Sequence, residues 1–150
     1  MLRSSGKCAA MTTSIDSNII IALWCKTDSS NRIAAKLLDQ AQRQGKLVIS
    51  APVYAELMAD PLRSRLELDE FTSDTGISID WKMDEDIWRE AVSAYRGYSK
   101  RRIRSGGGSP SRILADFLIG AHALVRGYSL LTLNGIDYVA AFPTLKIVPE

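Results

Sequence analysis

Four acidic residues stand in or beside strongly apolar segments, and no basic residue lies within three positions of any of them: Asp16, Glu56, Asp116 and Asp137. An ionised carboxylate beside an apolar core costs free energy unless a cation or hydrogen-bond donors compensate it. One shared divalent ion would compensate several such groups at once. The sequence therefore predicts a cluster of carboxylates that binds a metal ion.

A run of basic residues points to a polyanionic substrate. Between Glu90 and Asp116 the chain has no acid, and its basic residues there are Arg96, Lys100, Arg101, Arg102, Arg104 and Arg112. Alone, such a run is typical of a solvated loop. Beside a carboxylate cluster it indicates phosphate-binding groups, because bare carboxylates would repel a nucleic acid. We expect Arg104 and Arg112, which flank a glycine-rich loop, to bind substrate.

Length and composition indicate one globular domain. The 150 residues are 46% hydrophobic and 24% charged, which suffices for a core without covalent crosslinks. Two cysteines are too few for a disulfide framework, and no segment predicts a secretory signal or a membrane span. We expect a cytoplasmic protein with a disordered N-terminal extension over residues 1–11 and a single domain over residues 12–150.

Hydrophobic periodicity alternates strands with helices. Strands are predicted at 12–16, 47–50, 76–79, 129–132 and 145–148. A helix is predicted to begin at Asp16–Asn18, and further helices at 29–44, 52–59, 62–72, 84–98 and from 110 or 111 to about 126. This alternation predicts an α/β fold whose mainly parallel sheet is covered on both faces. Ligands of such folds gather outside the carboxyl ends of the strands. Each of the four acids lies after a strand or near the start of a helix, so all four can converge on that edge.

Four segments resemble, in order and spacing, the motifs of PIN-domain ribonucleases, particularly VapC-type toxins: Ile15–Asn18, Tyr54–Leu57, Ala115–Leu124, and Leu131–Asn134 through Asp137–Tyr138. The resemblance extends over residues 12–149. It implies a three-layer α/β/α fold and an endoribonuclease that depends on Mg²⁺ or Mn²⁺. It also implies RNA as substrate, a cognate antitoxin as inhibitor and, often, a homodimer.

The resemblance also implies roles for the acids. Asp16 and Asp116 are expected to bind the metal directly, since magnesium takes one or two carboxylates and keeps several waters. Glu56 and Asp137 would hold waters, orient the attacking one, or bind a second ion. Asn134 competes with Asp137 for the fourth position, because relatives carry an acid at one place or the other. In-line attack by water would leave a 5′-phosphate and a 3′-hydroxyl.

Other polar and aromatic residues have weaker claims to a role. Thr132 is expected at the substrate site, where its hydroxyl can reach the cluster. His122 lies six positions after Asp116 and off its helix face, which favours a packed histidine over a catalytic one. Burial is favoured over base stacking for the tryptophans Trp24, Trp81 and Trp88.

Two alternative functions fit the same residues. In a non-catalytic RNA-binding PIN-like module, residues 96–112 would bind RNA and the acids would be structural. A small-molecule phosphohydrolase on a related α/β fold is less well supported. The only glycine run, Gly106–Gly108, follows a basic helix, whereas a phosphate-binding loop follows a strand.

Overall fold

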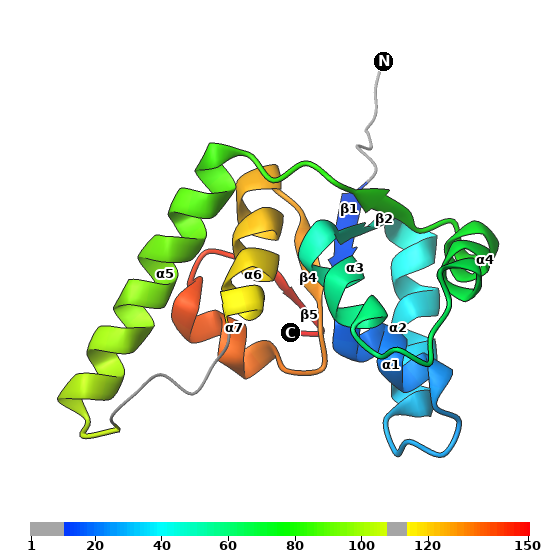
Figure 1. The fold of residues 1–150 in the computed structure, drawn as a ribbon, viewed down its shortest axis with the longest axis horizontal. Helices are drawn as coiled ribbons and strands as arrows, with labels where there is room; N and C mark the ends of the chain where they lie inside the picture. Colours follow the sequence, from blue (N-terminus) through cyan, green and yellow to red (C-terminus); the bar gives the residue numbers. More distant parts are fainter. Residues whose placement is uncertain (1–10, 108–113) are drawn as a thin grey trace.

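The computed structural model describes residues 11–107 and 114–150, which form five strands and seven helices (Figure 1). The strands are β1 (Met11–Ile15), β2 (Gly45–Ser50), β3 (Ser78–Asp80), β4 (Ser129–Leu131) and β5 (Ile147–Val148). The helices are α1 (Ser17–Trp24), α2 (Asn31–Gln44), α3 (Ala51–Met58), α4 (Arg65–Thr75), α5 (Glu85–Arg104), α6 (Leu114–Arg126) and α7 (Gly135–Ala141). Of the expected N-terminal extension, only Met11 is described, and it belongs to β1.

The strands form one parallel sheet in the order β3-β2-β1-β4-β5. Ser14 in the central strand β1 is paired with Val48 of β2 on one side and with Leu130 of β4 on the other. Strands β2 and β3 lie in succession on one side of β1, and β4, the next strand in the chain, lies on the opposite side of β1. The carboxyl ends of β1 and β4 therefore flank the point at which the strand order reverses, where ligands of open α/β sheets bind.

Helices cover both faces of the sheet, which confirms the predicted three-layer α/β/α architecture. Helices α1 and α2 pack against each other, while α5 packs against α6 and α7 in a second group (Figure 1). Helix α3 contacts both α1 and α6. The core between these layers includes the fully buried Ile15, Ile49 and Leu130 of three adjacent strands. No helix within the described residues is long and apolar enough to span a membrane.

Two elements differ from the sequence-based expectations. Helix α5 continues to Arg104 instead of ending near residue 98, so most of the basic run is helical. Basic side chains in the last turn and acids in the first turn both interact favourably with the helix dipole, which explains the extension. Helix α7 was not predicted, because its seven residues are too few for a clear period of 3.6. The expected start of α6 at residue 110 or 111 lies outside the described residues.

The expectation that all three tryptophans are buried is wrong for two of them. Trp81 is 60% exposed and Trp88 is 45% exposed. On α5, Ile87 and Ala91 are the buried residues, so the helical period turns Trp88 outward. Trp24 is partly buried and packs edge-on against Phe71, with 5.3 Å between the ring centroids.

Candidate active site

The carboxylate of Asp16 is held at the carboxyl end of the central strand. Asp16 follows β1, caps the N-terminus of α1 and is only 4% exposed. Its Oδ1 accepts a hydrogen bond from the Ser17 backbone N–H at 2.8 Å. Its Oδ2 accepts hydrogen bonds from the hydroxyls of Thr132 (2.7 Å) and Tyr138 (3.0 Å). Three donors from α1, the end of β4 and α7 thus fix one buried carboxylate in a single orientation.

The hydroxyl of Thr132 is itself held in place by the loop after β4. Thr132 is buried, and its Oγ1 accepts hydrogen bonds from the Asn134 backbone N–H (3.0 Å) and the Asn18 side-chain amide (3.2 Å). The Asn18 Oδ1 in turn accepts a hydrogen bond from the Leu133 backbone N–H at 3.2 Å. With both lone pairs of Oγ1 in use, the hydroxyl proton is directed to Asp16.

Glu56 lies beside Asp16 and shares a partner with it. Glu56 is half-buried on α3, and its Oε1 accepts a hydrogen bond from the Ser17 hydroxyl at 2.7 Å. Ser17 therefore donates its backbone N–H to one acid and its hydroxyl to the other. The second oxygen of Glu56, Oε2, makes no hydrogen bond within residues 11–107 and 114–150.

Asp116 completes a group of three interacting acids. It lies in the first turn of α6 and is half-buried. Burial raises the pKa of Asp16 above its ordinary value, and the negative charge of Asp116 raises it further against the lowering effect of the three hydrogen bonds. Burial likewise raises the pKa of Glu56, with added contributions from the charges of Asp16 and Asp116. The structure thus brings together three of the four acids.

The fourth predicted acid, Asp137, lies to the side of this group. It is exposed in the first turn of α7, and its charge is not among those that raise the pKa of Asp16 or Glu56. It lines a hollow of about 380 Å³ together with Arg101 and Arg102 of α5. The choice between Asp137 and Asn134 for the fourth position stays open, since Asn134 is also exposed.

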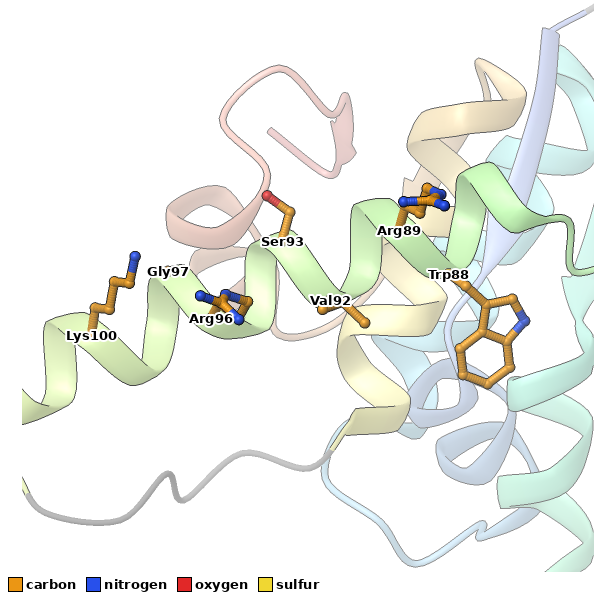
Figure 2. A pocket seen from close by; sticks show the side chains of 7 residues that line it. All are labelled: Trp88, Arg89, Val92, Ser93, Arg96, Gly97 and Lys100. Carbon is orange, nitrogen blue, oxygen red and sulfur yellow. The ribbon is translucent and has the colours of Figure 1, made fainter.

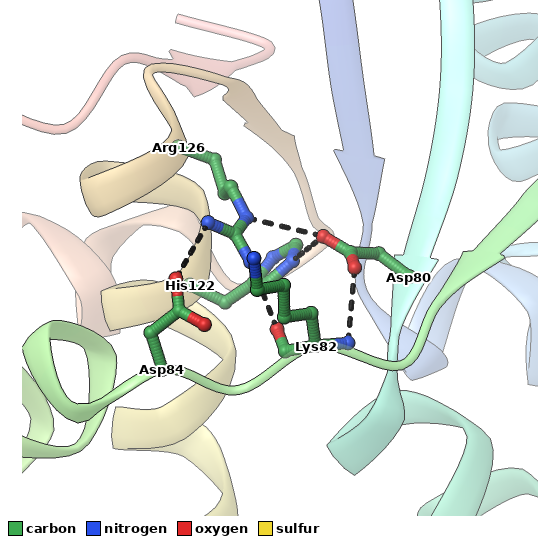
Figure 3. A network of polar contacts seen from close by, with 5 residues as sticks. All are labelled: Asp80, Lys82, Asp84, His122 and Arg126. Atoms are coloured by element: carbon green, nitrogen blue, oxygen red, sulfur yellow. Dashed lines mark hydrogen bonds and ion pairs between the residues drawn. The ribbon is translucent and has the colours of Figure 1, made fainter.

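Helix α6, which carries Asp116, is tied to the sheet by a second polar network (Figure 3). His122 is fully buried, and its Nε2 lies 2.9 Å from Oδ2 of Asp80 at the end of β3. Arg126 donates to Asp80 and to Asp84, each at 3.2 Å. Burial lowers the pKa of His122 although Asp80 opposes this shift. The histidine therefore fixes the position of α6, as expected for a packed residue.

The oxygen donors of the three acids are of the kind that divalent cations such as magnesium prefer. Asp16 and Glu56 are desolvated, and no Lys or Arg among the described residues bonds to either of them. Two raised pKa values without a cationic partner are what a missing positive charge would produce. Within the described part of the chain, no group of three or more Asp, Glu, His or Cys side chains is placed so that it could hold a metal ion. In this arrangement the three acids do not form a complete ligand set, so a bound ion would need waters or substrate oxygens as further ligands.

The sequence model of the PIN-domain family matches residues 14–139, which is most of the chain. The chain belongs to the PIN-domain family. This confirms the resemblance seen in the four sequence motifs, and membership indicates a nuclease. No curated protein sequence is significantly similar to the chain.

Several solved structures share the fold of this PIN domain, among them a toxin–antitoxin complex from Klebsiella pneumoniae. VapBC-1 from nontypeable Haemophilus influenzae is 22% identical, with a TM-score of 0.66 over 91% of this chain and 96% of that chain. VapBC2 from Rickettsia felis, bound to a promoter DNA fragment, is also 22% identical, with a TM-score of 0.61 over 91% and 97%. FitAcB from Neisseria gonorrhoeae is 20% identical, with a TM-score of 0.60 over 90% and 95%. Identities this low establish the shared fold alone.

Of the two basic residues predicted to bind substrate, the structure describes only Arg104, which forms no ion pair with the acids. Arg104 is exposed at the last residue of α5, at the periphery of the molecule (Figure 1). Arg112 lies outside the described residues. Conversely, sequence reasoning assigned no role to Tyr138, whose hydroxyl contacts Asp16. The feature of the sequence that could have identified Tyr138 is its position directly after Asp137 in a short helix. Adjacent residues of a helix point in different directions, and here Asp137 faces solvent while Tyr138 faces the core.

We predict that the three acids make metal-free protein less stable at neutral pH. A carboxyl group whose pKa is raised in the folded state stabilises the fold fully at pH values below its unfolded-state pKa. This stabilisation is lost as the pH rises through its folded-state pKa. Asp116→Asn removes one of the repelling charges. Its melting temperature in EDTA should exceed that of wild type at pH 7 by about 2–4 °C for each kcal/mol gained. The difference should vanish in acid.

The matched control for this measurement is Asp39→Asn, an exposed acid on α2 whose charge is not among those that raise the pKa of Asp16 or Glu56. Its melting temperature should follow that of wild type across the same pH series. Equal pH profiles for all three proteins would contradict electrostatic coupling among the acids.

We predict that Thr132→Val weakens metal binding by about 10- to 100-fold, the usual cost of losing a group that orients a ligand. Valine keeps the shape of threonine but cannot donate to Asp16. Thr132→Ser retains the hydroxyl and should bind within a few-fold of wild type. Calorimetric titration with Mn²⁺ measures both. Unchanged affinity in the valine variant would show that Asp16 does not need this donor.

Proposed function

We propose that the protein is a metal-dependent endoribonuclease and the toxin of a toxin–antitoxin pair. The observation that supports this most strongly is the group of Asp16, Glu56 and Asp116 beside the reversal of strand order, two with raised pKa values and no cationic partner. A nuclease of this kind has to bind a cation and then a phosphate in the same place. The remaining proposals concern how this chain would do so.

Asp16 and Asp116 would hold Mg²⁺ or Mn²⁺ between β1 and α6. When bound, such an ion lowers the pKa of water and neutralises charge that develops on the phosphate. Glu56 has one oxygen fixed by Ser17 and the other open to a water molecule. Its raised pKa brings it closer to the working pH, which favours its action as a general base.

Asp137 would act from the rim, where it can orient a water molecule or help to bind a second ion. The proposed reaction breaks the bond between phosphorus and the 3′-oxygen as water attacks in line. The products are a 5′-phosphate on one fragment and a 3′-hydroxyl on the other. His122 takes no part in the reaction, because this single histidine of the chain is bonded to Asp80.

RNA as substrate is supported by the basic end of α5. Arg101 and Arg102 line one hollow with Phe117, the residue next to Asp116. Their charges can hold the phosphates that the three acids would otherwise repel. The resemblance to VapC-type toxins favours RNA over DNA, and we propose that the protein acts in the cytoplasm.

A cognate antitoxin and a homodimer complete the proposal. Two of the solved structures with the same fold are named VapBC, and one of these is bound to a promoter DNA fragment. This supports a small DNA-binding partner that inhibits the nuclease. The homodimer rests on the same resemblance.

We predict that Asp16→Asn and Asp116→Asn each lower RNA cleavage by at least about 100-fold, comparable with the loss of a transition-state stabilising group. Asp39→Asn, an exposed acid on α2 that pairs with Arg43, is the matched control and should cleave like wild type. Cleavage should require Mg²⁺ or Mn²⁺ and leave 5′-phosphorylated fragments, which labelling of the products can detect.

Retained cleavage in both purified acid variants would contradict the proposal. RNA binding without any hydrolysis in Mg²⁺ would instead favour the non-catalytic module. Hydrolysis of a generic phosphate ester but not of RNA would favour the phosphohydrolase.

A further inference from the structure

The outward face of α5 carries a shallow hollow of about 540 Å³ that is lined only by residues of this helix (Figure 2). Trp88, Val92 and Arg96 project along one side of it at a spacing of four residues. Arg89 and Lys100 project along the other side (Figure 2). The hollow therefore combines an aromatic ring, an aliphatic side chain and three cations on one helix face.

The apolar part of this face is exposed. Trp88 and Val92 are 45% and 47% exposed, next to the buried Ile87 and Ala91 that anchor the helix. Tryptophan and arginine are enriched where proteins bind partners, and an exposed indole ring offers a flat surface on which a nucleic-acid base can stack.

The cationic part of this face is available to an anionic partner. After Glu90, the rest of α5 contains no acid. Arg96 and Lys100 form no ion pair with any described residue, whereas Arg89 lies against Glu85 one turn earlier. Both are far enough from the last turn that favourable interaction with the helix dipole does not explain them. Their charges match a chain of phosphates.

Gly97 keeps the floor of the hollow open. A glycine inside a helix is destabilising relative to alanine by about 1 kcal/mol. At this position a Cβ would meet only the Arg101 guanidinium at 3.4 Å, an ordinary contact, so the fold does not require glycine. Gly97 thus leaves room in the hollow that a larger side chain would fill.

We propose that this face of α5 binds single-stranded RNA outside the catalytic group, with a base stacked on Trp88 and phosphates held by Arg96 and Lys100. The inference rests on the proposed RNA substrate. From Trp88 to Arg102, which lines the hollow with Phe117 beside Asp116, α5 rises by about 21 Å. This length accommodates on the order of four nucleotides, as in the smallest single-strand sites. The helix would thus guide a strand toward the acids.

The test measures binding of a fluorescein-labelled oligouridylate in EDTA, where cleavage does not interfere, over a range of salt concentrations. Arg96→Gln/Lys100→Gln should lower the slope of log affinity against log salt by about 1.4, which is about 0.7 for each lost phosphate contact. Arg32→Gln/Lys36→Gln is the matched control, because these exposed residues of α2 have the same types and the same spacing. Its slope should equal that of wild type.

Two further variants separate binding from folding. Trp88→Leu should weaken binding by about 5- to 100-fold, whereas Trp81→Leu, at the other exposed tryptophan, should have little effect. Gly97→Gln should raise the melting temperature and yet weaken binding, because it improves the helix while filling the hollow. Opposite signs for stability and affinity cannot result from misfolding.

Equal affinity and equal salt slopes for wild type and all α5 variants would overturn the inference, as would failure of wild type to bind the oligonucleotide. Light scattering is run in parallel. If Trp88→Leu changes only the oligomeric state, the face binds a second copy and the inference is also wrong.

The proposed function is judged separately by cleavage in Mg²⁺. Cleavage with unchanged binding in the variants would refute only the α5 site, and salt-sensitive binding without cleavage would refute only the nuclease.

Discussion

The burial of one carboxylate, that of Asp16, is the constraint on which the site depends. A charged group in this position is stable only if donors and cations replace the water that it has lost. The chain supplies three donors from separate segments, through Ser17, Thr132 and Tyr138. Among the described residues it supplies no cation, and the pKa of Asp16 accordingly stays above its ordinary value. The fold thus pre-orients a carboxylate oxygen whose charge no described residue compensates, as the proposed site for a metal ion and a phosphate would require.

The parallel sheet and its helices make this arrangement possible. Reversal of the strand order beside β1 places Asp16 and Thr132 next to each other although 116 positions separate them in sequence. The third acid arrives on α6, whose position depends on the contacts of His122 and Arg126 with Asp80. Gly120 lets the same helix pack closely, because a Cβ there would lie 2.3 Å from the ring of Phe142. Asp116 is therefore placed by rigid packing, and small errors in that packing would misplace a ligand.

Much of this could be predicted from the sequence, because strands and long helices follow from hydrophobic period and parallel strands bring their carboxyl ends together. Asp16, Glu56 and Asp116 were singled out by their apolar surroundings, and the parallel strand order explains why the fold brings them together. Asp137 shows the limit: it satisfies the same local criterion, yet α7 turns it to the surface and turns Tyr138 inward. A helix of seven residues has too weak a period to predict which residue faces the core. The exposure of Trp88 was missed because this residue belongs to an apolar helical pattern, of which only Ile87 and Ala91 are buried in α5.

The most direct test of the metal site is a crystal structure with Mn²⁺, whose anomalous scattering locates the ion independently of the protein coordinates. We expect a peak in contact with carboxylate oxygens of Asp16 and Asp116, with Glu56 directed toward a water molecule beside it. In crystals of Asp116→Asn grown and soaked in the same way, the peak should be weaker or absent. A strong peak elsewhere, or no peak while Asp16 keeps its three hydrogen bonds, would mean that the three acids are structural and would contradict the proposed chemistry.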